Sequence, residues 1–143
     1  MNRHPYLRAY LAGIAVPTVF LLVTMTAYTL IRYVYDVPIP IERVIVFPMA
    51  AVPNAWGLWN LLYVALVEKR HISLGLFGAV LPLLLVPVGY IVVRILNFAV
   101  PPETFHEAPI VLAIAVVIYY LIWKYAVGFL NTELGVFPSV VRG

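Results

Sequence analysis

One uncharged stretch of the chain, residues 44–67, carries polar side chains at a depth where membrane helices are usually aliphatic. At about 1.5 Å rise per residue, Asn54 lies roughly 15 Å into a helix that starts at Val44, near the middle of a bilayer core about 30 Å thick. An amide at that depth needs a hydrogen-bond partner. The partner is either a neighbouring helix or a bound molecule, so this stretch is the first candidate for a binding site.

Aromatic side chains accompany the second amide of this stretch. Spacings of i, i+3, i+4 and i+7 place four residues on one helix face: Trp56, Trp59, Asn60 and Tyr63. Tryptophan is typical of the membrane interface, where its ring N–H stays hydrated, but Trp56 lies deeper than that. In one interpretation, the amides bond neighbouring helices and the rings fill the core of the bundle. In the other, the same side chains line a cavity for an apolar ligand.

Prolines predict kinks near the same depth in two consecutive helices. Pro53 in this helix and Pro82 in the next each remove a backbone hydrogen bond, and Pro82 deprives the carbonyl of Gly78 of its helical donor. Because the connection at residues 68–71 is short, the two helices are expected to form a hairpin and to be neighbours. The residues expected to line a cavity or polar contact between them are Asn54, Trp56, Asn60 and Gly78.

Lys124 is the only charged residue in the interior of a predicted membrane helix, since Arg32 and Arg94 lie at helix ends. An aromatic belt surrounds it, formed by Tyr119, Tyr120, Trp123 and Tyr125. One interpretation is that the stem of the lysine extends toward the lipid headgroups. The alternative is that its ammonium group points inward and binds an anionic headgroup or a carboxylate, because charges inside membranes are costly and often functional.

A polar group is expected where the third helix ends and the fourth begins. It consists of Arg94, Asn97, Glu103, His106 and Glu107. A cation beside two carboxylates and a histidine could form an active site or the mouth of an ion path. The plainer interpretation is a pair of solvated helix ends.

Several kinds of chemistry are excluded or disfavoured. The chain has no cysteine, which excludes disulfides and thiolate metal sites. All three histidines, at positions 4, 71 and 106, lie outside the predicted helices, and no cluster has metal-ligand spacing, so haem and metal are disfavoured. The net charge of +3 comes from thinly spread basic residues, which form no stripe for nucleic acid.

Four apolar stretches must position these residues, in a chain that is 64% hydrophobic and 10% charged. Each stretch reaches the roughly 20 residues that cross a bilayer. We therefore predict an all-α, polytopic integral membrane protein with one membrane domain over residues 1–143, folded as a four-transmembrane-helix bundle. The expected helices are residues 9–33, 44–67, 72–96 and 108–130.

The placement of lysine and arginine predicts the orientation of these helices. Six basic residues fall on one side of the predicted membrane, namely Arg3, Arg8, Lys69, Arg70, Lys124 and Arg142. Three fall on the other, namely Arg32, Arg43 and Arg94. Because lysine and arginine are enriched in cytoplasmic connections, both termini are expected on the cytoplasmic side of a bacterial-type plasma membrane.

Two short segments resemble a known family. The segment Pro53–Tyr63, with its proline, glycine, tryptophan and Leu-Tyr pattern, resembles the second helix of the tryptophan-rich sensory protein (translocator protein) family. Tyr120–Trp123 with Leu130 and Asn131 is similar to that family's last helix. The family has five helices, whereas four are predicted here, so we do not assign the chain to it. What the resemblance implies is a pocket for a hydrophobic ligand.

These observations favour a non-enzymatic membrane protein that binds an apolar ligand or lipid, or an accessory subunit of a membrane complex, because catalytic constellations are absent from the sequence. A small oligomeric transporter or flippase component is the alternative, with the kinked helices as a gate. A lipid-modifying enzyme built on the outer polar group is a third class. The expected partners are the bilayer, an apolar small molecule or lipid, and other membrane subunits or further copies of the chain. The sequence leaves the cofactor unknown, with haem and metal disfavoured.

Overall fold

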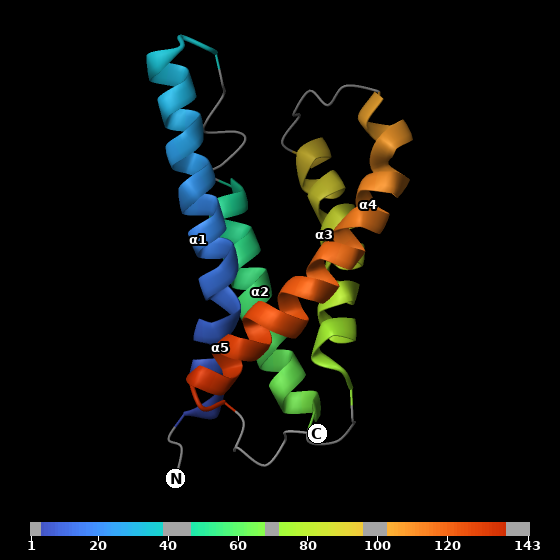
Figure 1. Cartoon of the computed structure of the whole chain (residues 1–143). Helices are drawn as coiled ribbons and strands as arrows, with labels where there is room; N and C mark the ends of the chain where they lie inside the picture. The colour runs from blue at the N-terminus through green and yellow to red at the C-terminus, as the bar shows by residue number, and fades with distance from the viewer. Residues whose placement is uncertain (1–3, 39–46, 68–71, 96–102, 137–143) are drawn as a thin grey trace. The chain divides into compact units, whose positions relative to one another are not determined.

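The computed structural model describes residues 4–38, 47–67, 72–95 and 103–136, and all the regular secondary structure in these residues is helical (Figure 1). The elements are α1 (Pro5–Val34), α2 (Phe47–Val67), α3 (Leu74–Ile95), α4 (Glu103–Ile122), the π-helix η2 (Trp123–Val127) and α5 (Gly128–Glu133). The all-α prediction is therefore confirmed. The fourth predicted helix, residues 108–130, begins earlier than expected, at Glu103, so Pro109 lies inside the helix and not in its opening turn.

Among the described residues, three helical segments are long and apolar enough to cross a membrane, judged by length and composition. They are Pro5–Val34, Leu74–Ile91 and Pro109–Glu133. The third runs without a break in helical structure through α4, η2 and α5. The chain thus has the helices that membrane insertion requires, and the full four-span arrangement remains a prediction.

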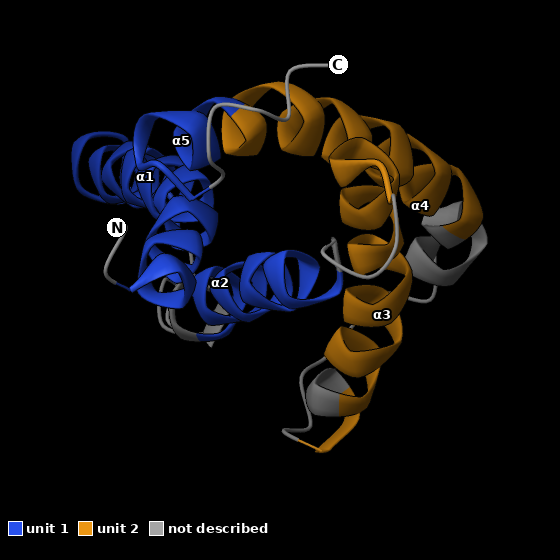
Figure 2. Ribbon diagram, turned by 90° about the horizontal axis from the view of Figure 1, so that it is seen from below, with its two compact units in different colours: residues 1–69, 129–143 blue, residues 70–128 orange. Residues whose placement is uncertain are grey.

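The chain divides into two compact units, which Figure 2 shows in different colours. Residues 1–69 and 129–143 form the first unit, with α1, α2 and α5 from Phe129 onward. Residues 70–128 form the second unit, with α3, α4 and η2. Each unit has its own packing, described in turn below. The expectation of one membrane domain over residues 1–143 stays a prediction.

In the first unit, α1 and α2 pack closely because small residues line their contact. The buried residues of α1 are Ala9, Ala12, Gly13 and Pro17. A Cβ atom at Gly13 would lie 2.6 Å from the carbonyl oxygen of Trp56 and 2.9 Å from the Cα atom of Gly57. Small residues four apart are the usual means by which membrane helices bring their backbones together. Helix α1 therefore presents its small face to α2.

In the second unit, α3 packs against α4 and η2, and two glycines of α3 receive bulky side chains. A Cβ atom at Gly75 would lie 2.8 Å from the ring of Tyr120, and one at Gly78 would overlap the side chain of Trp123. Trp123 is fully buried. The two glycines, three residues apart on one helix face, thus make room for aromatic rings from the following helix.

The end of α5 has a well-defined cap. Gly135 has φ of 62°, a left-handed conformation that glycine adopts without strain. Its N–H donates to the carbonyl of Thr132 at 3.0 Å, and the N–H of Val136 donates to the carbonyl of Asn131 at 2.8 Å. This is the Schellman arrangement, which satisfies carbonyl groups that a helix end leaves without donors.

Candidate functional site

The most deeply buried polar groups of the first unit are two amides that face one another. Asn60 of α2 and Asn131 of α5 both have 0% exposure. The Nδ2 atom of Asn60 donates to Oδ1 of Asn131 at 2.8 Å, and Nδ2 of Asn131 donates to Oδ1 of Asn60 at 3.1 Å. Asn60 Nδ2 also donates to the carbonyl oxygen of Ala9 at 2.7 Å. Both N–H groups and the oxygen of the Asn60 amide are therefore used within the protein.

The backbone of α1 is within reach of Asn60 because of Gly13. A Cβ atom at Gly13 would lie 3.0 Å from the Cβ atom of Asn60, closer than side chains normally approach. Glycine at this position lets α2 come near enough for the amide to reach the Ala9 carbonyl one turn earlier on α1. A larger side chain would push the donor away from its acceptor.

The α5 segment is also anchored at its C-terminal end by a cation from α1. Nη1 of Arg8 donates to the carbonyl oxygen of Leu134 at 3.2 Å. The carbonyl end of a helix carries partial negative charge, which favours a guanidinium at that place. The amide pair and this bond together tie α5 to α1 and α2 in the first unit.

The predicted aromatic face of α2 is present, and most of it is buried. Trp56 and Tyr63 are 3% and 6% exposed, and Trp59 is half-buried. Asn54 lies on a more exposed side, where its Oδ1 accepts a hydrogen bond of 2.5 Å from the hydroxyl of Tyr10 on α1. The two amides of α2 are thus satisfied by protein partners. These contacts favour the packing interpretation of the polar residues in α2, and the ligand cavity stays a prediction.

The other residues expected at the same site, Gly78 and Lys124, belong to the second unit. Gly78 lies against Trp123, and Lys124 is exposed. The ammonium nitrogen of Lys124 lies 5.7 Å from the ring centre of Tyr120 and 5.3 Å from that of Tyr125. A cavity shared by the α2 residues and Gly78 stays a prediction.

The outer polar group is described only in part. Arg94 is exposed, and its Nε atom donates to the hydroxyl of Tyr90 at 3.0 Å. Asn97 lies outside the described residues, and the same holds for the side chains of Glu103, His106 and Glu107. In the described part of the chain, no three His, Cys, Asp or Glu residues are placed to hold a metal ion. The group remains a prediction.

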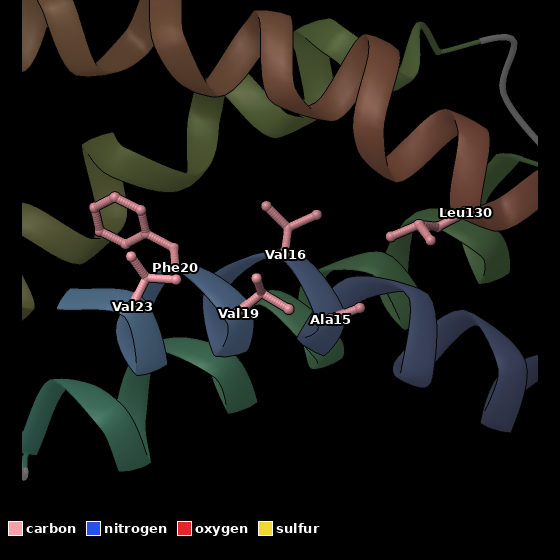
Figure 3. Close-up of a pocket in the computed structure, with 6 residues that line it drawn as sticks. All are labelled: Ala15, Val16, Val19, Phe20, Val23 and Leu130. Carbon is pink, nitrogen blue, oxygen red and sulfur yellow. The ribbon is translucent and has the colours of Figure 1, made fainter. Parts of the chain in front are cut away.

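A feature that sequence reasoning missed is an open apolar groove of about 550 Å³ in the first unit. Its lining residues are Ala15, Val16, Val19, Phe20, Val23 and Leu130. Figure 3 shows the five side chains of α1 along the helix, with Leu130 of α5 at one end of the row. Residues at spacings of four form this row, but α1 is apolar on most sides, so the spacing alone could not reveal it.

Comparison with protein-family models, curated proteins and solved structures finds no match to this chain. The resemblance of Pro53–Tyr63 to the tryptophan-rich sensory protein family is therefore not supported by a family match. The function must be inferred from the geometry of the chain itself.

Proposed function

We propose that this protein is a four-helix integral membrane protein that binds the acyl chain of a membrane lipid in the groove between α1 and α5. In this proposal α1, α2, α3 and the α4–α5 helix each cross a bacterial-type plasma membrane, with both termini cytoplasmic. The observation that carries the proposal is the groove, lined only by aliphatic residues and one phenylalanine on a helix long enough to span a bilayer.

The position of the groove favours a lipid chain over a ligand from water. The buried residues of α1 are confined to its small face toward α2, and Val19, Phe20 and Val23 of the groove are exposed, so in a membrane the groove would open to lipid tails. From Ala15 to Val23 the groove follows α1 for about 12 Å at the helical rise. An acyl chain laid along the helix fits such a shape.

Selectivity in such a groove would come from shape. A lipid tail that enters it leaves surroundings that are equally apolar, so the hydrophobic effect contributes little to binding. Van der Waals contacts and the fit of the chain against Phe20 and Leu130 must supply the preference. We therefore expect a modest preference for one chain shape over others. The accessory-subunit, transporter and lipid-modifying-enzyme interpretations stay predictions from the sequence.

A filled groove tests the proposal. Val19→Trp adds a large ring among the lining residues, whereas Leu22→Trp adds the same ring at an exposed position of α1 outside the groove. After purification in mild detergent and washing, we expect the first variant to retain less lipid per protein than the second, measured by mass spectrometry. Equal lipid retention by the two variants, both folded, would reject the groove as the binding site.

A further inference from the structure

Lys124 presents a positive charge on a helix that is otherwise suited to the bilayer core. It lies in the segment Pro109–Glu133, which is long and apolar enough to cross a membrane. The side chain is exposed, and the structure shows no ion pair between Lys124 and a carboxylate of the described residues. A charge inside the bilayer core is costly, and the cost falls when the ammonium group reaches the headgroups or lies beside an anion.

The ammonium group of Lys124 lies beside two tyrosine rings of its own helix. The ring centres of Tyr120 and Tyr125 are 5.7 Å and 5.3 Å from its nitrogen. Both distances lie within the range of cation–π attraction. Tyr125 is 63% exposed, whereas Tyr120 is half-buried. Lys124 and Tyr125 are thus exposed side chains of one helix segment, and the ring of Tyr120 lies beside the ammonium nitrogen.

Helix α3 packs against the Cβ atom of Lys124 and the ring of Tyr120. A Cβ atom at Gly75 would lie 3.2 Å from the Cβ atom of Lys124 and 2.8 Å from the ring of Tyr120. The close approach of α3 fixes the Cβ atom of the lysine and one ring while leaving the ammonium group exposed. Lys124 is the second residue of the π-helix η2, a type of distortion that often occurs at functional sites.

We propose that Lys124 and Tyr125 bind the phosphate of an anionic membrane lipid. At the helical rise, Lys124 lies roughly 13 Å from Glu133, and a lysine stem that swings away from the ring of Tyr120 can bring the ammonium group toward the headgroups. A lysine there attracts a phosphate as a point charge, and the hydroxyl of the exposed Tyr125 can donate to another phosphate oxygen. This site depends on membrane insertion but not on the groove of the first unit.

The test compares an anionic with a zwitterionic lipid. Wild-type protein and variants are titrated in detergent with phosphatidylglycerol and phosphatidylcholine of identical chains, and bound lipid is counted by native mass spectrometry. We expect Lys124→Gln to lower the preference for phosphatidylglycerol about fivefold, the effect of one basic residue near a membrane surface. Lys124→Arg should keep most of the preference, and Tyr125→Phe should lose part of it.

The matched control is Arg32→Gln, which removes another cation beside a tyrosine, near the end of α1. It should leave the preference unchanged. An equal loss in this variant, or no loss in a Lys124→Gln protein with wild-type helicity, would overturn the site. Displacement of phosphatidylglycerol by inorganic phosphate at equal concentration would overturn the lipid assignment. The groove variant Val19→Trp should leave this preference intact, which separates the two proposals.

Discussion

Asn60 and Asn131, separated by 71 positions in the sequence, form a fully buried amide pair with two reciprocal hydrogen bonds. A third bond joins Asn60 to the backbone of α1 at Ala9. The pair therefore connects three helices of the first unit at one point. Because each amide satisfies the other, replacing either one leaves the other with unsatisfied hydrogen-bonding groups. The free energy of unfolding lost in the double variant should therefore be smaller than the sum of the losses in the two single variants.

The first prediction concerns this pair. Asn131→Leu should destabilise the protein by about 1–3 kcal/mol, because it leaves the Asn60 amide with unsatisfied groups in a buried place. Asn60→Leu should lower the free energy of unfolding by less in the Asn131→Leu background than in the wild-type protein. Unfolding in mixed detergent, followed by circular dichroism, gives the four free energies of the double-mutant cycle.

The control for this cycle is Thr24→Val. The hydroxyl of Thr24 donates to the carbonyl of Phe20 in its own helix at 2.9 Å, so its loss should change the stability little. If the effects of the two asparagine changes simply add, the pair is not coupled as the geometry indicates.

The second prediction concerns the close contact of α1 and α2. Gly13→Ala should destabilise the first unit by about 1–3 kcal/mol, because the added methyl group meets the backbone of α2. Gly89→Ala is the matched change, since no atom lies within 4 Å of the position its Cβ would take. It should be neutral or stabilise α3 by up to about 1 kcal/mol. Equal thermal stability of the two variants would contradict the packing described for Gly13.

The third prediction concerns Gly78 and Trp123. Gly78→Ala should destabilise the second unit, because its methyl group would overlap the indole ring. Trp123→Ala should cost about 3–5 kcal/mol alone, since the ring is fully buried. The double variant should be destabilised by less than the sum of the two single effects, because alanine at position 123 leaves space for the methyl group at position 78. Protease resistance of the purified variants reports the order of stability, and strict additivity would count against the contact.

The sequence predicted where helices form, and it singled out Asn54 as the amide in need of a partner, with Asn60 on the aromatic face beside it. The structure buries Asn60 and leaves Asn54 exposed. The partner of Asn60 could not be predicted, since Asn131 lies after a π-helix that shifts the helical register, and no simple residue pattern marks such a shift. Gly78 was singled out for the carbonyl that Pro82 leaves without a donor, whereas its visible role is to accommodate Trp123. The groove escaped prediction because Val19 and Leu22 look alike in an apolar helix, although only the first lines it.

The fourth prediction is the orientation of the chain. The six-to-three distribution of basic residues predicts cytoplasmic termini. A fluorescent protein fused after Gly143 should be bright, and an alkaline phosphatase fused at the same place should be inactive. The reverse pattern would show that the C-terminus crosses to the other side.

The acyl-chain groove is tested most directly by photo-crosslinking the wild-type protein with a phospholipid that carries a diazirine along its acyl chain. Peptide mass spectrometry then locates the modified residues. We predict modification concentrated at Val19, Val23 and Leu130, which line the groove, over Leu11, Leu22 and Leu30, which are exposed on α1 outside it. Uniform labelling of all exposed residues of α1 would contradict the proposal, because it would show that the groove holds no lipid chain in preference to the rest of the helix.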